Sequence, residues 1–124
     1  MVVEDNATNR KVIEALVKKL GYAVTLFEDG QQALAAVEKG NTPALILMDV
    51  QMPVMDGITA TRLIREREAH LSQARLPIIA LTADAFEEDR QRCADAGMDD
   101  FLTKPINIDL LKTTLKRWLT KGRQ

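Results

Sequence analysis

The chain has 124 residues, 46% of them hydrophobic and 28% charged, which fits one globular domain with a single core, and we treat residues 1–124 as that domain. Seventeen basic and eighteen acidic residues give a formal net charge of -1 without a basic cluster, so we expect no nucleic-acid binding by this domain. No apolar run approaches the roughly 20 residues of a membrane span, and the single cysteine, Cys93, excludes an internal disulfide. These features predict a cytoplasmic segment without membrane contact.

Strand-forming and helix-forming stretches alternate along the whole chain. The expected elements, in chain order, are a strand at 1–3, a helix at 6–21, a strand at 22–27, a helix at 30–40, a strand at 44–49, a helix from 57, a strand at 77–82, a helix at 85–96, a strand at 98–103 and a helix from 107. Asn6 and Asn107 are suitable N-caps, and Gly21 is a suitable helix stop. The helix at 85–96 has few large apolar side chains, so we expect it to be weakly anchored.

The central stretch of the chain carries the strongest functional signal. Residues 44–49 form an unbroken apolar run that ends in a single carboxylate, Asp49, and Pro53 and Gly57 follow closely. Such a run predicts a buried strand that delivers Asp49 to a loop at its carboxyl end. The helix that opens at Gly57 is expected to lose definition in the polar stretch at 66–75.

The two longest apolar runs, 44–49 and 77–82, are too continuous to leave one face of a sheet in water. They predict an α/β fold, in which helices cover both faces of a parallel sheet. Right-handed crossovers place the carboxyl ends of all strands of such a sheet at one edge. The polar residues that close the strands should therefore meet there: Glu4, Asp5, Asp49, Thr82 and Lys104.

Three carboxylates in one crevice repel each other and therefore imply a bound cation. Oxygen ligands without a nearby Cys or His favour Mg²⁺, with Mn²⁺ as an alternative, and we assign Asp5 and Asp49 as ligands. Lys104 supplies a second positive charge, and the Thr82 hydroxyl is able to donate to a further oxygen. An aspartate, with a reference pKa of about 3.9, is ionised at neutral pH and attacks phosphorus without a general base. We predict phosphoryl transfer to Asp49, with Thr82 and Lys104 as the other catalytic residues.

Four segments carry a specific resemblance to a known family: residues 3–6, 47–57, 79–83 and 101–105. Over essentially its whole length the chain resembles the receiver domain of two-component response regulators. The resemblance implies that Asp49 accepts a phosphoryl group from a phosphohistidine. It also implies a Mg²⁺ site made by Asp5, Asp49 and the backbone carbonyl of Gln51, assisted by Glu4 through water. The implied fold is a single flavodoxin-like domain with five helices and five strands in the order 2-1-3-4-5.

The same resemblance implies a conformational switch made by Thr82 and Phe101. In the family's mechanism Thr82 moves toward the phosphoryl group, and Phe101 turns inward and remodels the surface of the fourth helix, fifth strand and fifth helix. The residues alone leave open that Phe101 is a static core aromatic. The family also implies a cis peptide bond between Lys104 and Pro105.

Three details resemble receivers attached to hybrid sensor histidine kinases: Asn6 with Asn9 and Arg10, the continuation at 83–85, and residues 97–101. The partner implied for such a receiver is a histidine phosphotransfer domain, or the histidine of the kinase itself, docked beside the first helix. The receiver is then part of a hybrid histidine kinase and not by itself a turnover enzyme.

Other classes of protein also fit parts of the pattern. A phosphatase of the haloacid-dehalogenase type uses a strand-terminal aspartate, but it needs a second aspartate two residues on, where this chain has Gln51. A flavodoxin-like FMN carrier is disfavoured because the acidic residues at 4–6 would repel a flavin phosphate. A phosphorylation-independent pseudo-receiver would lack a key residue, and none is missing. His70 is interpreted as a surface residue.

Overall fold

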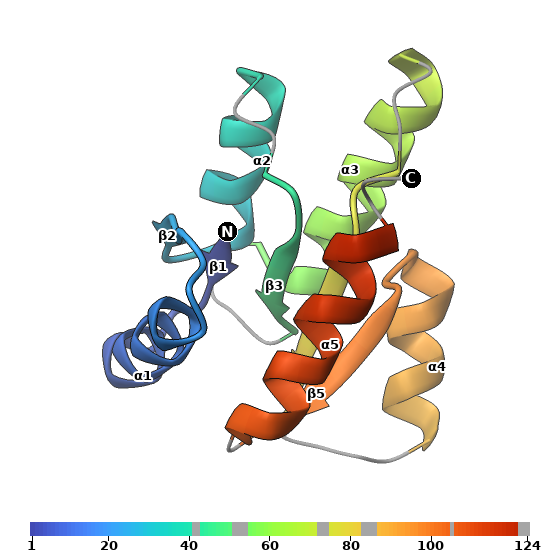
Figure 1. Ribbon diagram of the computed structural model, residues 1–124. Coiled ribbons are helices and arrows are strands. Elements are labelled where there is room, and N and C mark those ends of the chain that lie inside the picture. Colours follow the sequence, from blue (N-terminus) through green and yellow to red (C-terminus); the bar gives the residue numbers. More distant parts are fainter. Residues whose placement is uncertain (41–42, 51–54, 72–74, 83–86, 105, 122–124) are drawn as a thin grey trace.

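The computed structural model describes residues 1–40, 43–50, 55–71, 75–82, 87–104 and 106–121. Its backbone forms a five-stranded parallel sheet in the order β2-β1-β3-β4-β5, with five helices around it (Figure 1). The elements are β1 (Val2–Val3), α1 (Ala7–Lys19), β2 (Leu26–Phe27), α2 (Gly30–Glu38), β3 (Ile46–Asp49), α3 (Gly57–Leu71), β4 (Ile78–Thr82), α4 (Glu87–Ala96), β5 (Asp100–Thr103) and α5 (Ile108–Lys121). Both the predicted α/β class and the strand order are confirmed.

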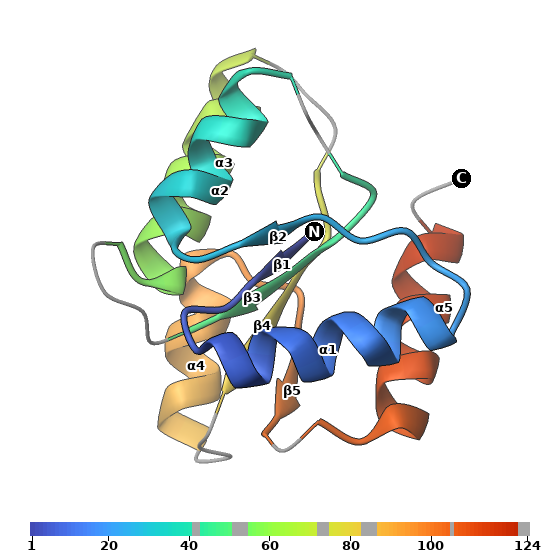
Figure 2. The same cartoon turned by 90° about the vertical axis from the view of Figure 1, so that its left-hand side faces the viewer.

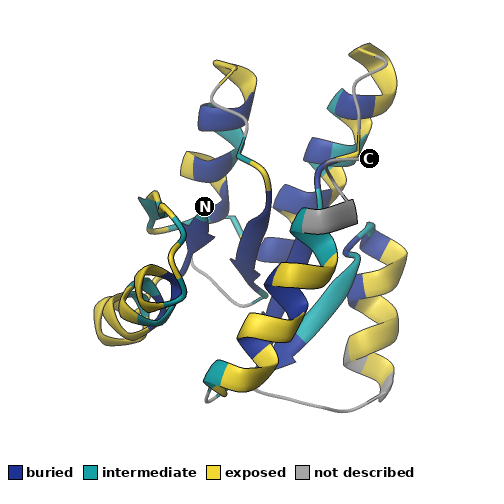
Figure 3. Cartoon of the chain, in the orientation of Figure 1, coloured by how far each residue is buried: buried dark blue, intermediate teal, exposed yellow. Residues whose placement is uncertain are grey.

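Helices cover both faces of the sheet, with α1 and α5 on one face and α2, α3 and α4 on the other (Figure 2). Alternate residues of β3 enter the two halves of the core. Ile46 and Met48 belong to the cluster beneath α2, α3 and α4, whereas Leu47 belongs to the cluster beneath α1 and α5. The unbroken apolar run is therefore explained, because both faces of β3 are buried (Figure 3).

The register of the parallel strands brings their carboxyl ends to one edge. Val3 lies opposite Met48, and Asp49 lies opposite Leu81. One strand further on, Thr82 lies opposite Thr103. The residues that follow β1 and β5 therefore lie at the same edge as the last residues of β3 and β4.

Local capping sets the ends of several helices. The Asn6 side chain accepts a hydrogen bond from the backbone N–H of Asn9 at 3.0 Å, and the Asn107 side chain accepts one from Asp109 at 2.8 Å. Gly21 follows α1 with a φ of 92°, in the left-handed region that suits glycine. Both predicted N-caps and the predicted stop are confirmed.

Two sequence-based expectations about element length are wrong. The second strand covers only Leu26–Phe27, and Tyr22 and Val24 precede it, although they pack against the core cluster beneath α1 and α5. The helix α3 continues past residue 66 to Leu71. It continues because Glu68 is buried in its last turns and is satisfied there by hydrogen bonds.

A group of four charged side chains holds this end of α3 to the start of β4 and β5. Arg65 contacts Glu68 and Asp99, each at 2.8 Å, and Arg75 contacts Asp99 at 2.8 Å. We call these four residues the Arg65 cluster. Gly97 has a φ of 107° and packs closely on Arg65. A Cβ on residue 97 would lie only 2.7 Å from Cγ of Arg65.

The helix α4 shows few buried side chains, as its composition predicts. Among the described side chains of α4, Cys93 and Ala96 are buried, and both lie in its carboxyl-terminal half. Within the described part of the chain, none of the helices is long and apolar enough to cross a membrane.

Candidate functional site

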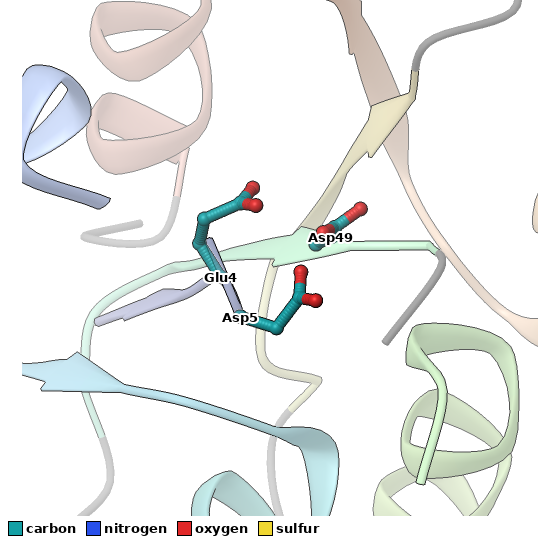
Figure 4. A group of neighbouring side chains, drawn as sticks. All are labelled: Glu4, Asp5 and Asp49. Atoms are coloured by element: carbon teal, nitrogen blue, oxygen red, sulfur yellow. The ribbon is translucent and has the colours of Figure 1, made fainter. Parts of the chain in front are cut away.

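Three carboxylates meet at the carboxyl edge of the sheet. Glu4 and Asp5 directly follow β1, and Asp49 is the last residue of β3. One oxygen atom from each side chain lies within 4.8 Å of the others (Figure 4). The structure therefore brings together the three carboxylates that the sequence predicted to meet.

The three carboxylates differ in their exposure to solvent. Glu4 is 1% exposed and Asp49 is 4% exposed, whereas Asp5 is classed as exposed. One oxygen of Glu4 accepts a hydrogen bond from the backbone N–H of Asn6 at 3.3 Å. Asp5 is thus the member of the group that a ligand from solvent reaches first.

Lys104 is the cation that faces this group. Its Nζ lies 2.8 Å from Oε2 of Glu4 and 3.2 Å from Oδ1 of Asp49. Burial lowers the pKa of Lys104, but hydrogen bonds and charge attraction from Glu4 and Asp49 outweigh it, so the pKa is raised above its usual 10.5. One ammonium then faces three carboxylates, which leaves an excess of negative charge.

Thr82 and Phe101 lie on the strands next to Asp49. Thr82 is the buried last residue of β4, and its carbonyl accepts a hydrogen bond from the backbone N–H of Lys104 at 2.7 Å. Phe101 is half-buried on β5, and the guanidinium carbon of Arg90 lies 4.1 Å from its ring centroid. The predicted movement of Thr82 and Phe101 stays a prediction.

Gly57 supports the backbone at Asp49, a role that the sequence analysis missed. Its N–H donates to the carbonyl of Val50 at 3.1 Å, and a Cβ at this position would collide with the carbonyl oxygen of Asp49. Only glycine allows the start of α3 to approach the end of β3 this closely. From the sequence, Gly57 was expected only to begin a helix.

Some predictions concern residues outside the described ranges. Gln51, expected to offer its backbone carbonyl to the metal, is one of them. Pro105 is another, so the expected cis bond after Lys104 also stays a prediction.

The donor set fits a hard divalent cation. The group consists of carboxylate oxygens from Glu4, Asp5 and Asp49, and it contains neither Cys nor His. Mg²⁺ prefers such oxygen ligands and keeps several waters, for which the exposed side of Asp5 leaves room. A cation bound here would offset the charge that Lys104 leaves unbalanced.

A flavodoxin-like sheet that carries an acidic group and a lysine at its carboxyl edge defines a receiver-type signalling domain. Comparison with protein families agrees with this class: the model described as "Response regulator receiver domain" matches residues 1–116. The chain belongs to the response regulator receiver family, and it is a receiver domain of a two-component phosphorelay.

Similar curated proteins include hybrid histidine kinases. The chain is 39% identical over 118 residues to hybrid signal transduction histidine kinase A of Dictyostelium discoideum, covering 95% of this chain and 6% of that protein. It is 42% identical over 118 residues to the sensor protein GacS of Pseudomonas syringae pv. syringae, covering 95% of this chain and 13% of that protein. The chain thus spans a small part of the relatives it matches.

Similar solved structures include a receiver domain with a bound metal and a receiver domain with a partner protein. A receiver domain of a sensor histidine kinase from Pseudomonas aeruginosa PAO1, with a magnesium ion coordinated in its active site cleft, is 47% identical, with a TM-score of 0.83 and coverage of 96% of this chain and 94% of that one. A second structure is the receiver domain of a Saccharomyces cerevisiae response regulator, crystallised with a histidine phosphotransfer protein. It is 32% identical, with a TM-score of 0.92 and coverage of 99% of this chain and 89% of that one. The haloacid-dehalogenase alternative is not supported.

Proposed function

We propose that Asp49 is the phosphoacceptor of this receiver and takes its phosphoryl group from a phosphohistidine in a Mg²⁺-dependent reaction. One observation carries the proposal: the Asp49 carboxylate ends β3 beside two further carboxylates and 3.2 Å from the ammonium of Lys104. An oxygen of Asp49 forms the new O–P bond while the N–P bond of the donor breaks. The histidine nitrogen keeps the electron pair of that bond and takes up a proton.

Asp5 and Asp49 would hold the metal directly, together with the backbone carbonyl of Gln51. Glu4 would act through water, since its carboxylate is already engaged by Lys104 and by the Asn6 backbone. The bound cation lowers the repulsion between the carboxylates and the incoming phosphoryl oxygens. Mn²⁺ is a second hard cation that this oxygen donor set suits.

Lys104 and Thr82 would hold the transferred phosphoryl group. The ammonium of Lys104 already lies next to Asp49, so after transfer it would pair with an oxygen of the phosphoryl group. Movement of the Thr82 hydroxyl toward that group would let Phe101 turn inward and alter the surface of α4, β5 and α5. Support for mobility comes from α4, in which Cys93 and Ala96 are the buried residues among the described side chains.

A histidine phosphotransfer domain, or the kinase's own histidine, would dock beside α1. A hollow of about 400 Å³ next to the site is lined by Asn9, Val12, Ile13, Lys104 and Ile106. Val12 is 51% exposed and offers an apolar contact there. The yeast receiver with its phosphotransfer protein supports this class of partner. The similarity to hybrid kinases supports an origin of residues 1–124 as the receiver domain of such a kinase.

Intact mass spectrometry tests the proposal directly. The wild-type protein and Asp49→Ala are incubated with acetyl phosphate, in Mg²⁺ and in chelator. The expected result is one added phosphoryl group, found only in the wild type with Mg²⁺. The proposal fails if folded wild-type protein gains nothing or if Asp49→Ala gains the same mass. Continuous phosphate release over many turnovers would instead indicate a hydrolase.

A further inference from the structure

Arg10, in the first turns of α1, reaches back to the loop that carries two of the three carboxylates. Its Nη1 donates to the backbone carbonyl of Glu4 at 2.9 Å and has a longer contact of 3.4 Å with the carbonyl of Asp5. The Arg10 side chain is half-buried. One guanidinium group thus bridges the two backbone units from which the acidic side chains project.

Two further hydrogen bonds connect this loop with α1. The Glu4 carboxylate accepts from the backbone N–H of Asn6 at 3.3 Å, and the Asn6 side chain accepts from the backbone N–H of Asn9 at 3.0 Å. Together with the Arg10 contact they join residues 4–10 into one hydrogen-bonded unit. The orientation of this loop is therefore fixed by the first turns of the helix.

The position of Asp5 depends most on that orientation. Among the described residues, Glu4 is held by Lys104 through an ion pair, whereas the structure gives the Asp5 carboxylate no hydrogen bond or ion pair. Asp5 is also exposed. Its backbone must therefore bring its carboxylate within reach of Asp49, and Arg10 holds that backbone.

We propose that Arg10 is a positioning residue for the divalent cation, acting through the Glu4 and Asp5 carbonyls. The inference rests on the proposed function of the carboxylate site. Both contacts come from one nitrogen, Nη1, at the end of a long side chain with a planar guanidinium, whereas the ammonium of a lysine lies on a flexible side chain that is one bond shorter. Loss of the two Nη1 contacts frees the loop and weakens cation binding.

The sign of the effect separates positioning from simple electrostatics. Arg10 is a cation close to a cation site, so its removal would strengthen Mg²⁺ binding if charge were its only contribution. Removal of a positioning residue weakens binding instead. Lys11 is the matched control, because it is the next residue of α1, carries the same charge and is exposed.

Isothermal titration calorimetry with Mg²⁺ on the wild type, Arg10→Ala, Arg10→Lys and Lys11→Ala provides the test. Contacts that orient metal ligands typically change metal affinity by about tenfold or more. We therefore expect the Kd of Arg10→Ala to rise about tenfold, while Lys11→Ala stays within about twofold of wild type. Arg10→Lys keeps the charge but carries it on a shorter side chain, so its Kd should also rise, and this variant provides the test if Arg10→Ala does not fold.

A second readout distinguishes positioning from general damage. At saturating Mg²⁺ the rate of phosphorylation by acetyl phosphate should return to the wild-type value in Arg10→Ala, because only cation binding is impaired. Unchanged or tighter Mg²⁺ binding in Arg10→Ala overturns the inference, as does a rate that stays low at saturation. A wild-type protein that binds Mg²⁺ but gains no phosphoryl group contradicts the proposed function and leaves the affinity test of Arg10 valid.

Discussion

The two ends of the sheet carry polar groups of opposite character. In the Arg65 cluster, at the amino ends of β4 and β5, two arginines face two carboxylates. The backbone N–H groups of Leu76 and Ile78 donate to Glu68 and Asp99, at 2.7 Å and 2.9 Å. Every oxygen of these two carboxylates therefore has a donor, and the cluster is balanced in charge.

The carboxyl edge is left unbalanced. Among the described residues, three carboxylates (Glu4, Asp5 and Asp49) meet here against two cations, Lys104 and the nearby Arg10, and Asp5 is open to solvent. Buried charge is tolerated in folded proteins when it is paired and hydrogen-bonded, as in the Arg65 cluster. Charge that is left unpaired at an accessible site favours a ligand of opposite sign. The comparison indicates that the first edge serves stability and the second serves binding and chemistry.

The largest expected effect on stability follows from breaking the balanced cluster. Arg65→Met leaves the buried Glu68 and Asp99 with fewer donors, so the free energy of unfolding should fall by about 3 kcal/mol. Urea denaturation, monitored by the fluorescence of Trp118, measures this change in the free energy of unfolding. Arg75→Met, which removes an arginine whose side chain is 58% exposed, should cost less than about 1 kcal/mol.

Asp49→Asn is the corresponding change at the other edge. It removes one of three repelling charges, so the free energy of unfolding should not fall, although phosphorylation is lost. Equal losses of stability in Arg65→Met and Asp49→Asn would contradict the contrast between the two edges.

A smaller effect should distinguish docking from chemistry at the carboxyl edge. Val12→Asp places a charge on the apolar patch beside α1, so phosphotransfer from a phosphorylated histidine phosphotransfer domain should slow by about tenfold, the equivalent of about 1.4 kcal/mol. Phosphorylation by acetyl phosphate should stay unchanged, because the small donor needs no docking surface. Leu71→Asp is the matched control, since Leu71 is 46% exposed and lies at the end of α3. A rate lowered equally for both donors would argue against docking at Val12.

The smallest effect concerns alkaline pH. The pKa of Lys104 is raised in the folded protein, so its ion pairs stabilise the fold fully below the unfolded pKa of about 10.4. That contribution should be lost as pH rises through the folded value, which lies above 10.5. Urea denaturation between pH 7 and pH 11 should show a steeper alkaline loss for wild type than for Lys104→Met. Parallel curves would mean that Lys104 adds no such contribution.

The fold was predictable because its signals are local. Both faces of β3 are buried, so its apolar run is continuous, and Asn6 and Asn107 cap the helices that immediately follow them. The expected meeting of Asp49 with Glu4 and Asp5 followed from the parallel topology alone. These features depend on near neighbours in the chain or on a general rule of sheet geometry.

The failures share a physical cause. The polar stretch at 66–75 was predicted to end the helix because the sequence does not show that Glu68 is buried there, where Arg65 and the backbone N–H of Leu76 donate to its carboxylate. Likewise, the sequence did not show that Lys104 pairs with Glu4, at 2.8 Å, in addition to Asp49, at 3.2 Å. A charged residue does not reveal its partner in the sequence, since any of many opposite charges would serve.

The sequence by itself determined the α/β class, the order of elements and the identity of the residues that close the strands, because apolar periodicity and capping act locally. Only the tertiary structure decided which charges are paired. It placed Lys104 between Glu4 and Asp49, held the Asp5 backbone with Arg10 and closed the Arg65 cluster. These pairings depend on distances of a few ångströms between segments that meet only after the sheet has formed.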